Sequence, residues 1–169
     1  MKPIIRKAQP QDAVKIIKLI NEIISEPDSN LEMSPGEFLH SLDQEQKILE
    51  DFSNSENSIF LIAEVEGEII GSIICHGSSR KASRHSVEIS MSVASNWRGK
   101  HIGTELMQAA IEWARNTNII KRMDLIVFER NSTAIQLYEK FGFEKEGLLR
   151  KSIYRDGKYL NAYLMALLI

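Results

Sequence analysis

The chain has 169 residues, of which 43% are hydrophobic and 26% are charged, and its formal net charge at pH 7 is -2. This composition is typical of a globular protein and the length suits one core, so we expect residues 1–169 to form a single domain. A net charge so close to zero gives no reason to expect a nucleic acid or an acidic membrane as a partner.

Cysteine usage and hydropathy exclude further classes of protein. Cys75 is the only cysteine and lies in an apolar run, which excludes an internal disulfide and a multi-cysteine metal site. His76 and His85 show no metal-ligand spacing, so we expect no metal. No apolar segment follows the basic start Met1–Lys7, and no run of about 18 apolar residues occurs. We therefore expect neither a secretory signal nor a membrane span, and the cytoplasm as compartment.

The first third of the chain predicts a strand, two helices and a long loop. Ile4 and Ile5 indicate a short extended start, and the turn-forming residues 9–12 lead into a helix. The apolar positions of this helix are Val14, Ile17, Leu19, Ile20 and Ile24. Two prolines make the stretch Ser25–Gly36 a loop. A second, more polar helix follows, with an apolar stripe of Phe38, Leu42, Ile48, Leu49 and Phe52.

From Ser58 onward the apolar pattern changes to that of strands. Two β-branched runs, Ile59–Val65 and Ile69–Cys75, flank Glu66-Gly67-Glu68 and predict a β-hairpin. Residues 87–93 then alternate between apolar and polar side chains, which predicts a strand with two different faces. The apolar face carries Val87, Ile89, Met91 and Val93, and the polar face carries Glu88, Ser90 and Ser92.

The second half of the chain alternates helices with strands. Three elements come first: the helix Thr104–Asn116, the strand Met123–Phe128 and the helix Ser132–Lys140. Two strand-like runs, Phe143–Ser152 and Tyr159–Ile169, then flank residues 155–158, whose Asp-Gly pair is a strong hairpin signal. The resulting order βααβββαβαββ predicts one mixed α/β domain without internal repeats.

In the segment Val93–Thr104 a strand passes through a glycine-containing loop into a helix. Backbone N–H groups at such a junction point into one concavity, and the first helical turn adds unsatisfied donors and the positive end of the helix dipole. Gly99 and Gly103 permit close approach of a ligand, while Arg98 and Lys100 can contact phosphate oxygens. An ordinary βα turn with two solvated basic residues explains the same spacing, whereas the P-loop and GxGxxG motifs are both missing.

This segment resembles motif A of the GNAT superfamily of N-acetyltransferases, Q/R-x-x-G-x-G/A at the start of a helix. Arg98 and Gly103 match, and the intermediate glycine of the pattern falls at His101, for which we expect an ordinary helical or extended φ. The resemblance extends from about Ile59 to the C-terminus and implies a GNAT-like fold, with a central mixed, largely antiparallel sheet of about seven strands flanked by about four helices. It also implies that acetyl-CoA is the cofactor, with its pyrophosphate held by Arg98, Gly99, Lys100, His101, Ile102, Gly103 and Thr104.

A second signature lies in the last predicted helix. Asn131 and Tyr138 are seven residues apart, which places them on one helix face two turns apart. Residues 131–143 are similar to the family's N-x-x-A-x-x-L/F-Y-x-K-x-G-F pattern. This implies that Asn131 contacts the pantetheine arm and that Tyr138 is the general acid for the cofactor sulfur. From the residues alone, an N-cap role for Asn131 and a core role for Tyr138 are the simpler interpretations.

The resemblance also assigns roles to the strand 87–93. The backbone of Val93 would pair with pantetheine as though the cofactor were an added strand, and its N–H would polarise the thioester carbonyl. Met91 is assigned to the cofactor with it. An alkyl amine has a pKa of about 10.4 and needs a base at neutral pH, for which Glu88 on the polar face is our candidate. The alternative is a solvated glutamate, and a bulge would change the face that Glu88 occupies.

The expected acceptor is a primary amine of a small molecule or of a protein N-terminus. We expect the loop Ser25–Glu37 and the hairpin Tyr154–Asn161 to recognise it, because these parts vary between family members. Glu26, Asp28, Glu32 and Glu37 form an acidic cluster that suits a cationic amine, although a solvated loop explains them as well.

The main rival to an enzyme is a catalytically silent acyl-CoA-binding module that acts as a sensor or partner protein. Tyr138 favours the enzyme, because a pure binder has no need of an acid for the thiolate. The identity of the acceptor, the length of the acyl chain and the oligomeric state, with a homodimer as one option, stay open.

Overall fold

The computed structural model of the chain describes residues 2–169. Its strands are β1 (Ile4–Lys7), β2 (Ile59–Val65), β3 (Glu68–Gly77), β4 (Ser86–Val93), β5 (Arg122–Phe128), β6 (Glu144–Arg155) and β7 (Lys158–Leu168). Its α-helices are α1 (Ala13–Ile24), α2 (Leu42–Asn54), α3 (Ile102–Asn116) and α4 (Ser132–Lys140). The strands form a 7-stranded sheet in the order β1-β2-β3-β4-β5-β7-β6. This confirms the predicted fold class and order of elements.

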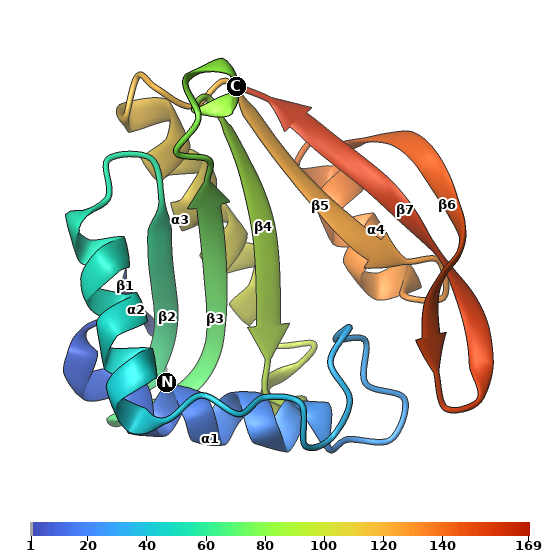
Figure 1. Ribbon diagram of the computed structural model, residues 1–169, viewed down its shortest axis with the longest axis horizontal. Coiled ribbons are helices and arrows are strands. Elements are labelled where there is room, and N and C mark those ends of the chain that lie inside the picture. The colour runs from blue at the N-terminus through green and yellow to red at the C-terminus, as the bar shows by residue number, and fades with distance from the viewer. Residues whose placement is uncertain (1) are drawn as a thin grey trace.

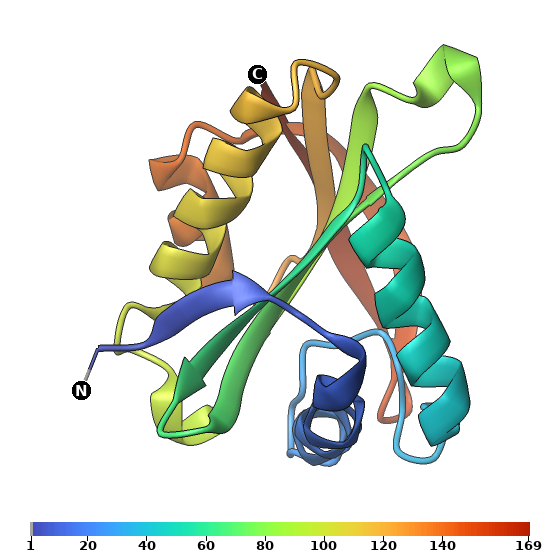
Figure 2. The same cartoon turned by 90° about the vertical axis from the view of Figure 1, so that its left-hand side faces the viewer.

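Helices cover both faces of the sheet. Figures 1 and 2 show α1 and α2 on one face and α3 and α4 on the other. The larger apolar core lies under α3 and α4 and includes Leu106, Met123 and the fully buried Cys75, while a second core under α1 and α2 includes Ile16 and Ile62. None of the helices in residues 2–169 is both long enough and apolar enough to span a bilayer.

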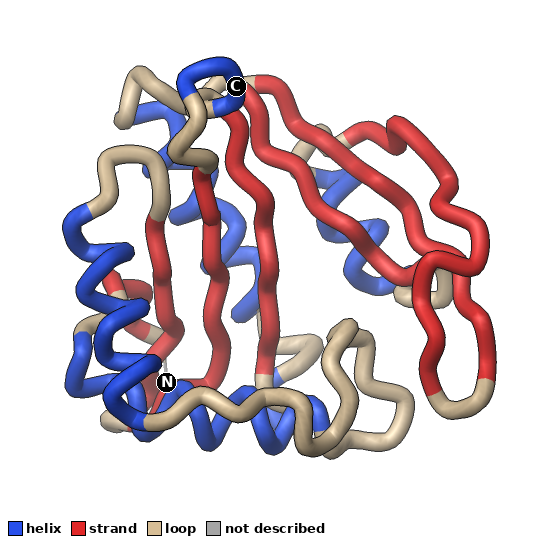
Figure 3. Tube along the Cα trace, viewed as in Figure 1, coloured by secondary structure: helices blue, strands red, loops and turns tan. Residues whose placement is uncertain are grey.

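The sheet divides between β4 and β5, whose pairing is the only parallel one among residues 2–169. Only Ser86–Glu88 of β4 pair with β5, whereas β4 pairs with β3 without interruption from Val87 to Val93. Beyond the short parallel contact the two strands diverge, as Figures 1 and 3 show. The second half of β4 therefore keeps one backbone edge free of a neighbouring strand.

The two N-terminal helices differ in detail from the prediction. Val14 was expected in the apolar stripe of the first helix but is 60% exposed. Leu19, Ile20 and Ile24 are buried as predicted, and Ala13, Ile16 and Ile23 are buried in addition. The helix begins at Ala13, and this start sets a rotational phase in which Val14 points away from the sheet. The apolar spacing alone was compatible with either phase.

The second helix begins later than its apolar pattern suggested. Phe38 precedes α2, and Leu42 is exposed, because a capping box fixes the helix start at Ser41. The Ser41 hydroxyl accepts from the Gln44 N–H at 3.2 Å, and the Gln44 side chain accepts from the Ser41 N–H at 2.8 Å. Glu45 is buried in this helix, with His40 Nδ1 2.7 Å from its carboxylate.

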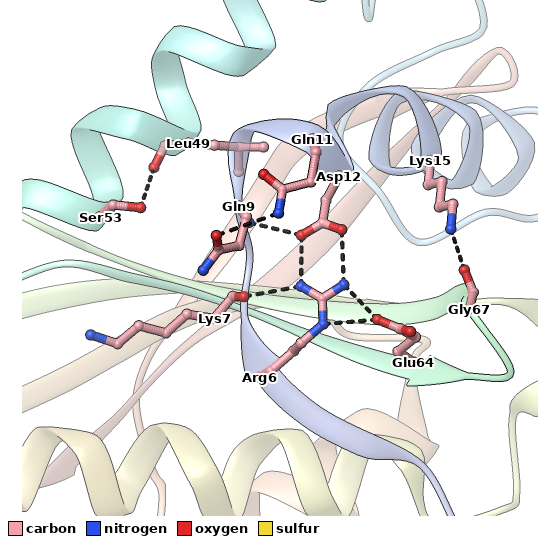
Figure 4. Close-up of polar contacts among 10 residues, drawn as sticks. All are labelled: Arg6, Lys7, Gln9, Gln11, Asp12, Lys15, Leu49, Ser53, Glu64 and Gly67. Carbon is pink, nitrogen blue, oxygen red and sulfur yellow. Dashed lines mark hydrogen bonds and ion pairs between the residues drawn. The ribbon is translucent and has the colours of Figure 1, made fainter.

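An ion-pair network fixes the first strand and the first helix to the sheet (Figure 4). The guanidinium of Arg6 donates to both carboxylate oxygens of Asp12, at 2.7 and 2.8 Å, and to Glu64 from the neighbouring strand. The Gln9 N–H adds a third hydrogen bond to Asp12. These bonds, above all that from Arg6, lower the pKa of the Asp12 carboxyl. Glu64 is therefore part of a structural ion pair.

Candidate active site

A cavity of about 800 Å³ lies at the division of the sheet, beside the C-terminal end of β4. Its walls come from β4, from the loop that enters α3, from α4 and from the segment that follows α1. It brings together ten of the predicted site residues: Met91, Val93, Arg98, Gly99, His101, Ile102, Gly103, Thr104, Asn131 and Tyr138. Lys100 and Glu88 are not among the lining residues.

The start of α3 presents free backbone donors to this cavity. Glu105 N–H donates to His101 O at 3.0 Å and is the first backbone hydrogen bond of the helix. The N–H groups of residues 102–104 therefore have no partner within the helix. Within residues 2–169, the N-cap residue His101 makes no side-chain hydrogen bond to these N–H groups. These free N–H groups, together with the helix dipole, make the site suitable for an anion.

His101 does not have the ordinary φ that we expected. Its φ is 64° and its ψ is 9°, which is the left-handed region, and Gly99 has a φ of 73°. The chain leaves the short 3-10 helix Ser95–Trp97 and must turn sharply into α3, which begins two residues before its predicted start. Histidine is one of the few residues other than glycine that adopts this region with some frequency. The departure from the family pattern is thus accommodated by a left-handed histidine.

Gly103 is needed for packing. A Cβ at this position would lie 3.3 Å from Leu137 Cδ2 and 3.4 Å from Met91 Cε, so the start of α3 approaches α4 and β4 closely here. A Cβ at Gly99 would meet no atom within 4 Å, and this glycine instead serves the left-handed backbone. We predicted that both glycines permit close approach of a ligand. In the structure each position requires glycine for a different reason, close packing at Gly103 and a positive φ at Gly99.

Arg98 is engaged by the protein itself. Its Nε donates to Val93 O at 3.0 Å, and its Nη2 lies 2.6 Å from Glu26 Oε2. Lys100 is exposed, with its Nζ 4.8 Å from the centroid of the Trp97 ring. The backbone donors of α3, and not these cations, are the groups that face the cavity without a protein partner.

The same ion pair weakens the case for an acidic acceptor cluster. Glu26 is paired with Arg98, and Asp28 lies 3.6 Å from Arg130. Glu37 accepts a hydrogen bond from the Ser34 N–H at 2.7 Å. Two of the four proposed carboxylates are therefore paired with arginines, so the cluster carries less net negative charge than its sequence suggested.

The free edge of β4 directs backbone groups toward the cavity. Ala94 N–H donates to Ile70 O at 2.9 Å, which makes residue 94 one of the positions that bond to β3. Because bonding positions alternate in an antiparallel pair, the N–H and C=O groups of Met91 and Val93 point away from β3, toward the division of the sheet. This is the orientation that pairing with an extended ligand requires, although the Val93 carbonyl already accepts from Arg98.

Tyr138 and Asn131 share the cavity-facing side of α4. Tyr138 is only 7% exposed, and burial raises the pKa of its phenol to about 12, so it stays protonated at neutral pH. Asn131 caps α4, and its Oδ1 accepts from the Ala134 N–H at 3.3 Å. The simpler N-cap interpretation of Asn131 is therefore correct, and its side-chain NH2 group remains able to donate to a ligand.

Glu88 lies apart from the cavity. It is exposed, and its register neighbours are His76 on β3 and Asp124 on β5. The pairing with β3 has no bulge, so Glu88 keeps the face opposite Val87 that the alternation predicted. The opposite face, with Val87, belongs to the core under α3 and α4, which also contains Tyr138. Glu88 is therefore on the side of the sheet that carries α1 and α2.

Sequence reasoning missed the apolar wall of the cavity, and it assigned the polar wall to the acceptor without placing it beside β4. Trp97 and Leu137 supply apolar surface, and Leu137 could have been found from its spacing of three residues from Ala134 on the same helix face. The polar wall is the segment Asp28–Leu31, which the sequence placed in a variable loop without indicating its distance from β4.

Comparisons with known proteins agree with this geometry. The model of the acetyltransferase (GNAT) family matches residues 20–143. A GNAT-family acetyltransferase from Streptococcus pneumoniae is 31% identical, with a TM-score of 0.96 over 99% of this chain and 100% of that one. The protein yncA from Salmonella typhimurium, solved with its cofactor acetyl-CoA, shares the fold with a TM-score of 0.87 at 21% identity, over 99% of this chain and 94% of that one.

Curated relatives match over shorter stretches. The L-amino acid N-acetyltransferase AaaT of Escherichia coli is 34% identical over 106 residues, which cover 63% of this chain and 65% of AaaT. The matched stretch thus spans just under two thirds of AaaT. The ribosomal protein uS5-alanine N-acetyltransferase of Escherichia coli is 30% identical over 60% of this chain and 52% of its own length. Because the family model covers well over half of the residues, the chain belongs to the acetyltransferase (GNAT) family.

Proposed function

We propose that this chain transfers the acetyl group of acetyl-CoA directly to a primary amine. The observation that carries the proposal is the cavity shared by the uncapped start of α3, the free edge of β4 and the buried phenol of Tyr138. Membership of the acetyltransferase family makes the chain an N-acetyltransferase, and family members that share its fold have been solved with acetyl-CoA. Each of the three features suits a different part of that cofactor.

The residues present fit acetyl-CoA from its pyrophosphate to its thioester. The N–H groups of residues 102–104 would hold the pyrophosphate, with Arg98 and Lys100 at the margin of that site. The backbone of Met91 and Val93 would pair with the pantetheine arm, and the amide of Asn131 would donate to it. Acetyl-CoA supplies the activated thioester, while the protein supplies the donors that orient it.

Transfer requires one bond to form and one to break. The free amine attacks the thioester carbonyl, a C–N bond forms, and the Val93 N–H stabilises the negative charge on the carbonyl oxygen. The C–S bond then breaks, and Tyr138 donates its proton to the departing thiolate. The amine proton goes to a base, directly or through water, and Glu88 is our proposed base on the face from which the amine would approach.

The acceptor is proposed by class only. Curated relatives are named for L-amino acids, the alanine of ribosomal protein uS5 and spermidine, all of which present a primary amine. Release of free CoA thiol should therefore be measured with panels of amino acids, polyamines and peptides with free N-termini. Acetyl-CoA binding without turnover of any panel member would favour the silent binding module.

Tyr138→Phe is the decisive variant for the chemistry. It should lower kcat by roughly 100-fold while the affinity for CoA stays within about twofold, because only the proton donor is lost. The matched control is Tyr163→Phe, which removes another phenol at a position outside the cavity lining and should leave kcat unchanged. An unchanged kcat for Tyr138→Phe would assign the acid to another group.

Glu88→Gln tests the base. The variant should fold and bind CoA normally, but kcat/KM should fall at pH 6 to 7 and recover as the pH approaches the pKa of the amine, about 10.4. A deprotonated amine needs no base, so the deficit should shrink as the pH rises. Rates equal to wild type across this range would show that another group or solvent takes the proton.

A further inference from the structure

The segment Asp28–Met33, here called the bridging segment, follows α1 and lies beside the division of the sheet. Asp28 to Leu31 line the cavity together with β4 and α4. In Figure 1 the connection from α1 to α2 passes from the end of α1 toward the β6–β7 hairpin, on the α1 and α2 side of the sheet. The segment has no regular secondary structure, so other groups must hold its backbone in place.

Arg155, at the end of β6, holds this backbone. Its side chain is only 5% exposed, and its Nη1 donates to Leu31 O and to Met33 O, both at 2.7 Å. Its Nη2 donates to Ile24 O at 3.2 Å, at the end of α1. A buried arginine usually faces a carboxylate, but the carboxylate of Asp156 is 3.6 Å from Nε and mostly exposed. The guanidinium is thus committed to three backbone carbonyls.

Arg130 holds the other end of the bridging segment. Its Nη2 donates to Ser29 O at 3.1 Å and to Asp28 O at 3.4 Å, and its Nε donates to Asn30 Oδ1 at 3.1 Å. Both arginines come from the part of the chain that follows β4, and all their acceptors come from the part that precedes it. They therefore connect the two halves of the molecule where the sheet itself contributes only three residue pairs.

The chemistry of arginine explains why this residue type suits the task. A planar guanidinium offers five N–H donors in a fixed arrangement, so one side chain can serve several carbonyls at once. Lysine has a compact ammonium group at the end of a flexible chain and cannot reproduce that geometry. Hydrogen bonds from a charged donor are also stronger than neutral ones, which matters for a segment that lacks ladder hydrogen bonds.

We propose that Arg155 is a positioning residue for the amine acceptor, acting through the bridging segment with Arg130 as its second support. The inference rests on the proposed function. The backbone donors of α3 and the side chains of Asn131 and Tyr138 from α4 lie on one side of the sheet, so a thioester extended through the division emerges on the other side. The bridging segment bounds that side, and the acceptor must approach beside it. Displacement of this wall should impair acceptor binding more than cofactor binding.

The experiment compares Arg155→Met, Arg155→Lys and Arg130→Met with the control Arg150→Met, which removes an exposed arginine of the same strand β6 outside the hairpin Tyr154–Asn161. Hydrogen exchange is followed in residues 25–36 and, as an internal reference, in β2 and β3. Both Arg155 variants should lose protection in residues 25–36 and raise the acceptor KM roughly tenfold or more, with the acetyl-CoA KM within about threefold of wild type. Arg130→Met should show a smaller change of the same kind, and Arg150→Met none.

Several results would overturn the proposal. Wild-type protection of residues 25–36 in Arg155→Met would show that the arginine does not hold the segment. Equal increases in both KM values would show that Arg155 has no specific role toward the acceptor. Full rescue by Arg155→Lys would show that the planar guanidinium, on which the proposal rests, is not required. If Arg155→Met fails to fold, Arg130→Met decides, since its side chain is 36% exposed and its loss is easier to tolerate. If the wild type acetylates no amine, the proposed function fails, while the exchange data still judge the contact.

Discussion

The N-termini of α2 and α3 solve the same problem in opposite ways. At α2, the side chains of Ser41 and Gln44 satisfy backbone donors in a capping box that faces solvent. At α3, the equivalent positions hold His101 and Thr104, the described residues supply no cap, and the helix start faces the cavity. A helix end that has no protein partner and borders a cavity retains its donors for a ligand. The presence or absence of a cap therefore distinguishes the structural helix start of α2 from the ligand-binding helix start of α3.

The largest expected effect comes from closing the α3 start with a negative charge. Thr104→Asp, at the third position of the helix, should weaken CoA binding by roughly 100-fold, because a carboxylate would lie beside the pyrophosphate. The same carboxylate interacts favourably with the helix dipole, so the melting temperature should stay equal or rise. Calorimetric titration with CoA measures the first effect and thermal unfolding the second.

The matched control for this variant is Gln44→Glu, the corresponding third position of α2. It introduces the same charge at a solvent-facing helix start and should leave CoA affinity unchanged. CoA binding by Thr104→Asp at wild-type strength would show that the cofactor phosphates lie elsewhere, and the contrast between the two helices would lose its functional meaning.

The start of α1 adds a third case to the comparison, because its N-cap residue Asp12 is already paired with Arg6. Asp12→Asn should lower the free energy of unfolding at pH 7 by about 2 kcal/mol, since Arg6 loses its charged partner. The folded pKa of Asp12 lies below its ordinary value of about 3.9, so this stability is present above pH 3.9 and is lost as the pH falls through the folded value. Urea unfolding at pH 7, 5 and 3 should show wild type and variant converging, and a difference independent of pH would contradict the assignment.

The smallest effect concerns backbone conformation at the two helix starts. His101→Gly should raise the free energy of unfolding by up to about 1 kcal/mol, because glycine adopts a φ of 64° without a Cβ penalty. CoA affinity should stay within about twofold, since the donors keep their positions. Ser41→Gly should have the opposite sign and cost about 0.5 kcal/mol, because Ser41 has a φ of -69° and loses its cap oxygen. Equal signs in denaturant titrations would show that the left-handed turn carries no strain.

Local patterns predicted most of the fold because each depends on neighbouring residues. The type I′ turns at Glu66-Gly67 and Asp156-Gly157, with both central φ values positive, occur where the turn residues indicated hairpins. The helix of residues 132–140 has the predicted bounds because Asn131 caps it and Gly142 follows it. Val14 is the exposed member of the predicted α1 stripe, because apolar spacing alone does not determine where a helix starts.

The sequence predicted most of the residues that line the candidate site, but not the contacts that these residues make with distant parts of the chain. The motifs identified the loop into α3 and the face of α4, and the structure brings both to one cavity. The partners of Arg98 were not predictable, because Glu26 is 72 residues away in the sequence and belongs to a loop without a periodic pattern. For the same reason the contacts of Arg155 with carbonyls more than 120 residues away left no local signal.

The burial of Cys75 has a practical consequence for following the bridging segment in solution. Burial raises the pKa of this thiol to about 12 and removes it from solvent, so it should not react with maleimides in the native protein. The wild-type sequence is therefore ready for site-specific labelling. One cysteine introduced at exposed Glu32 and another at exposed Lys158 would carry a spin-label pair. The spread of distances between the two labels would then report directly how firmly the segment is held against the hairpin.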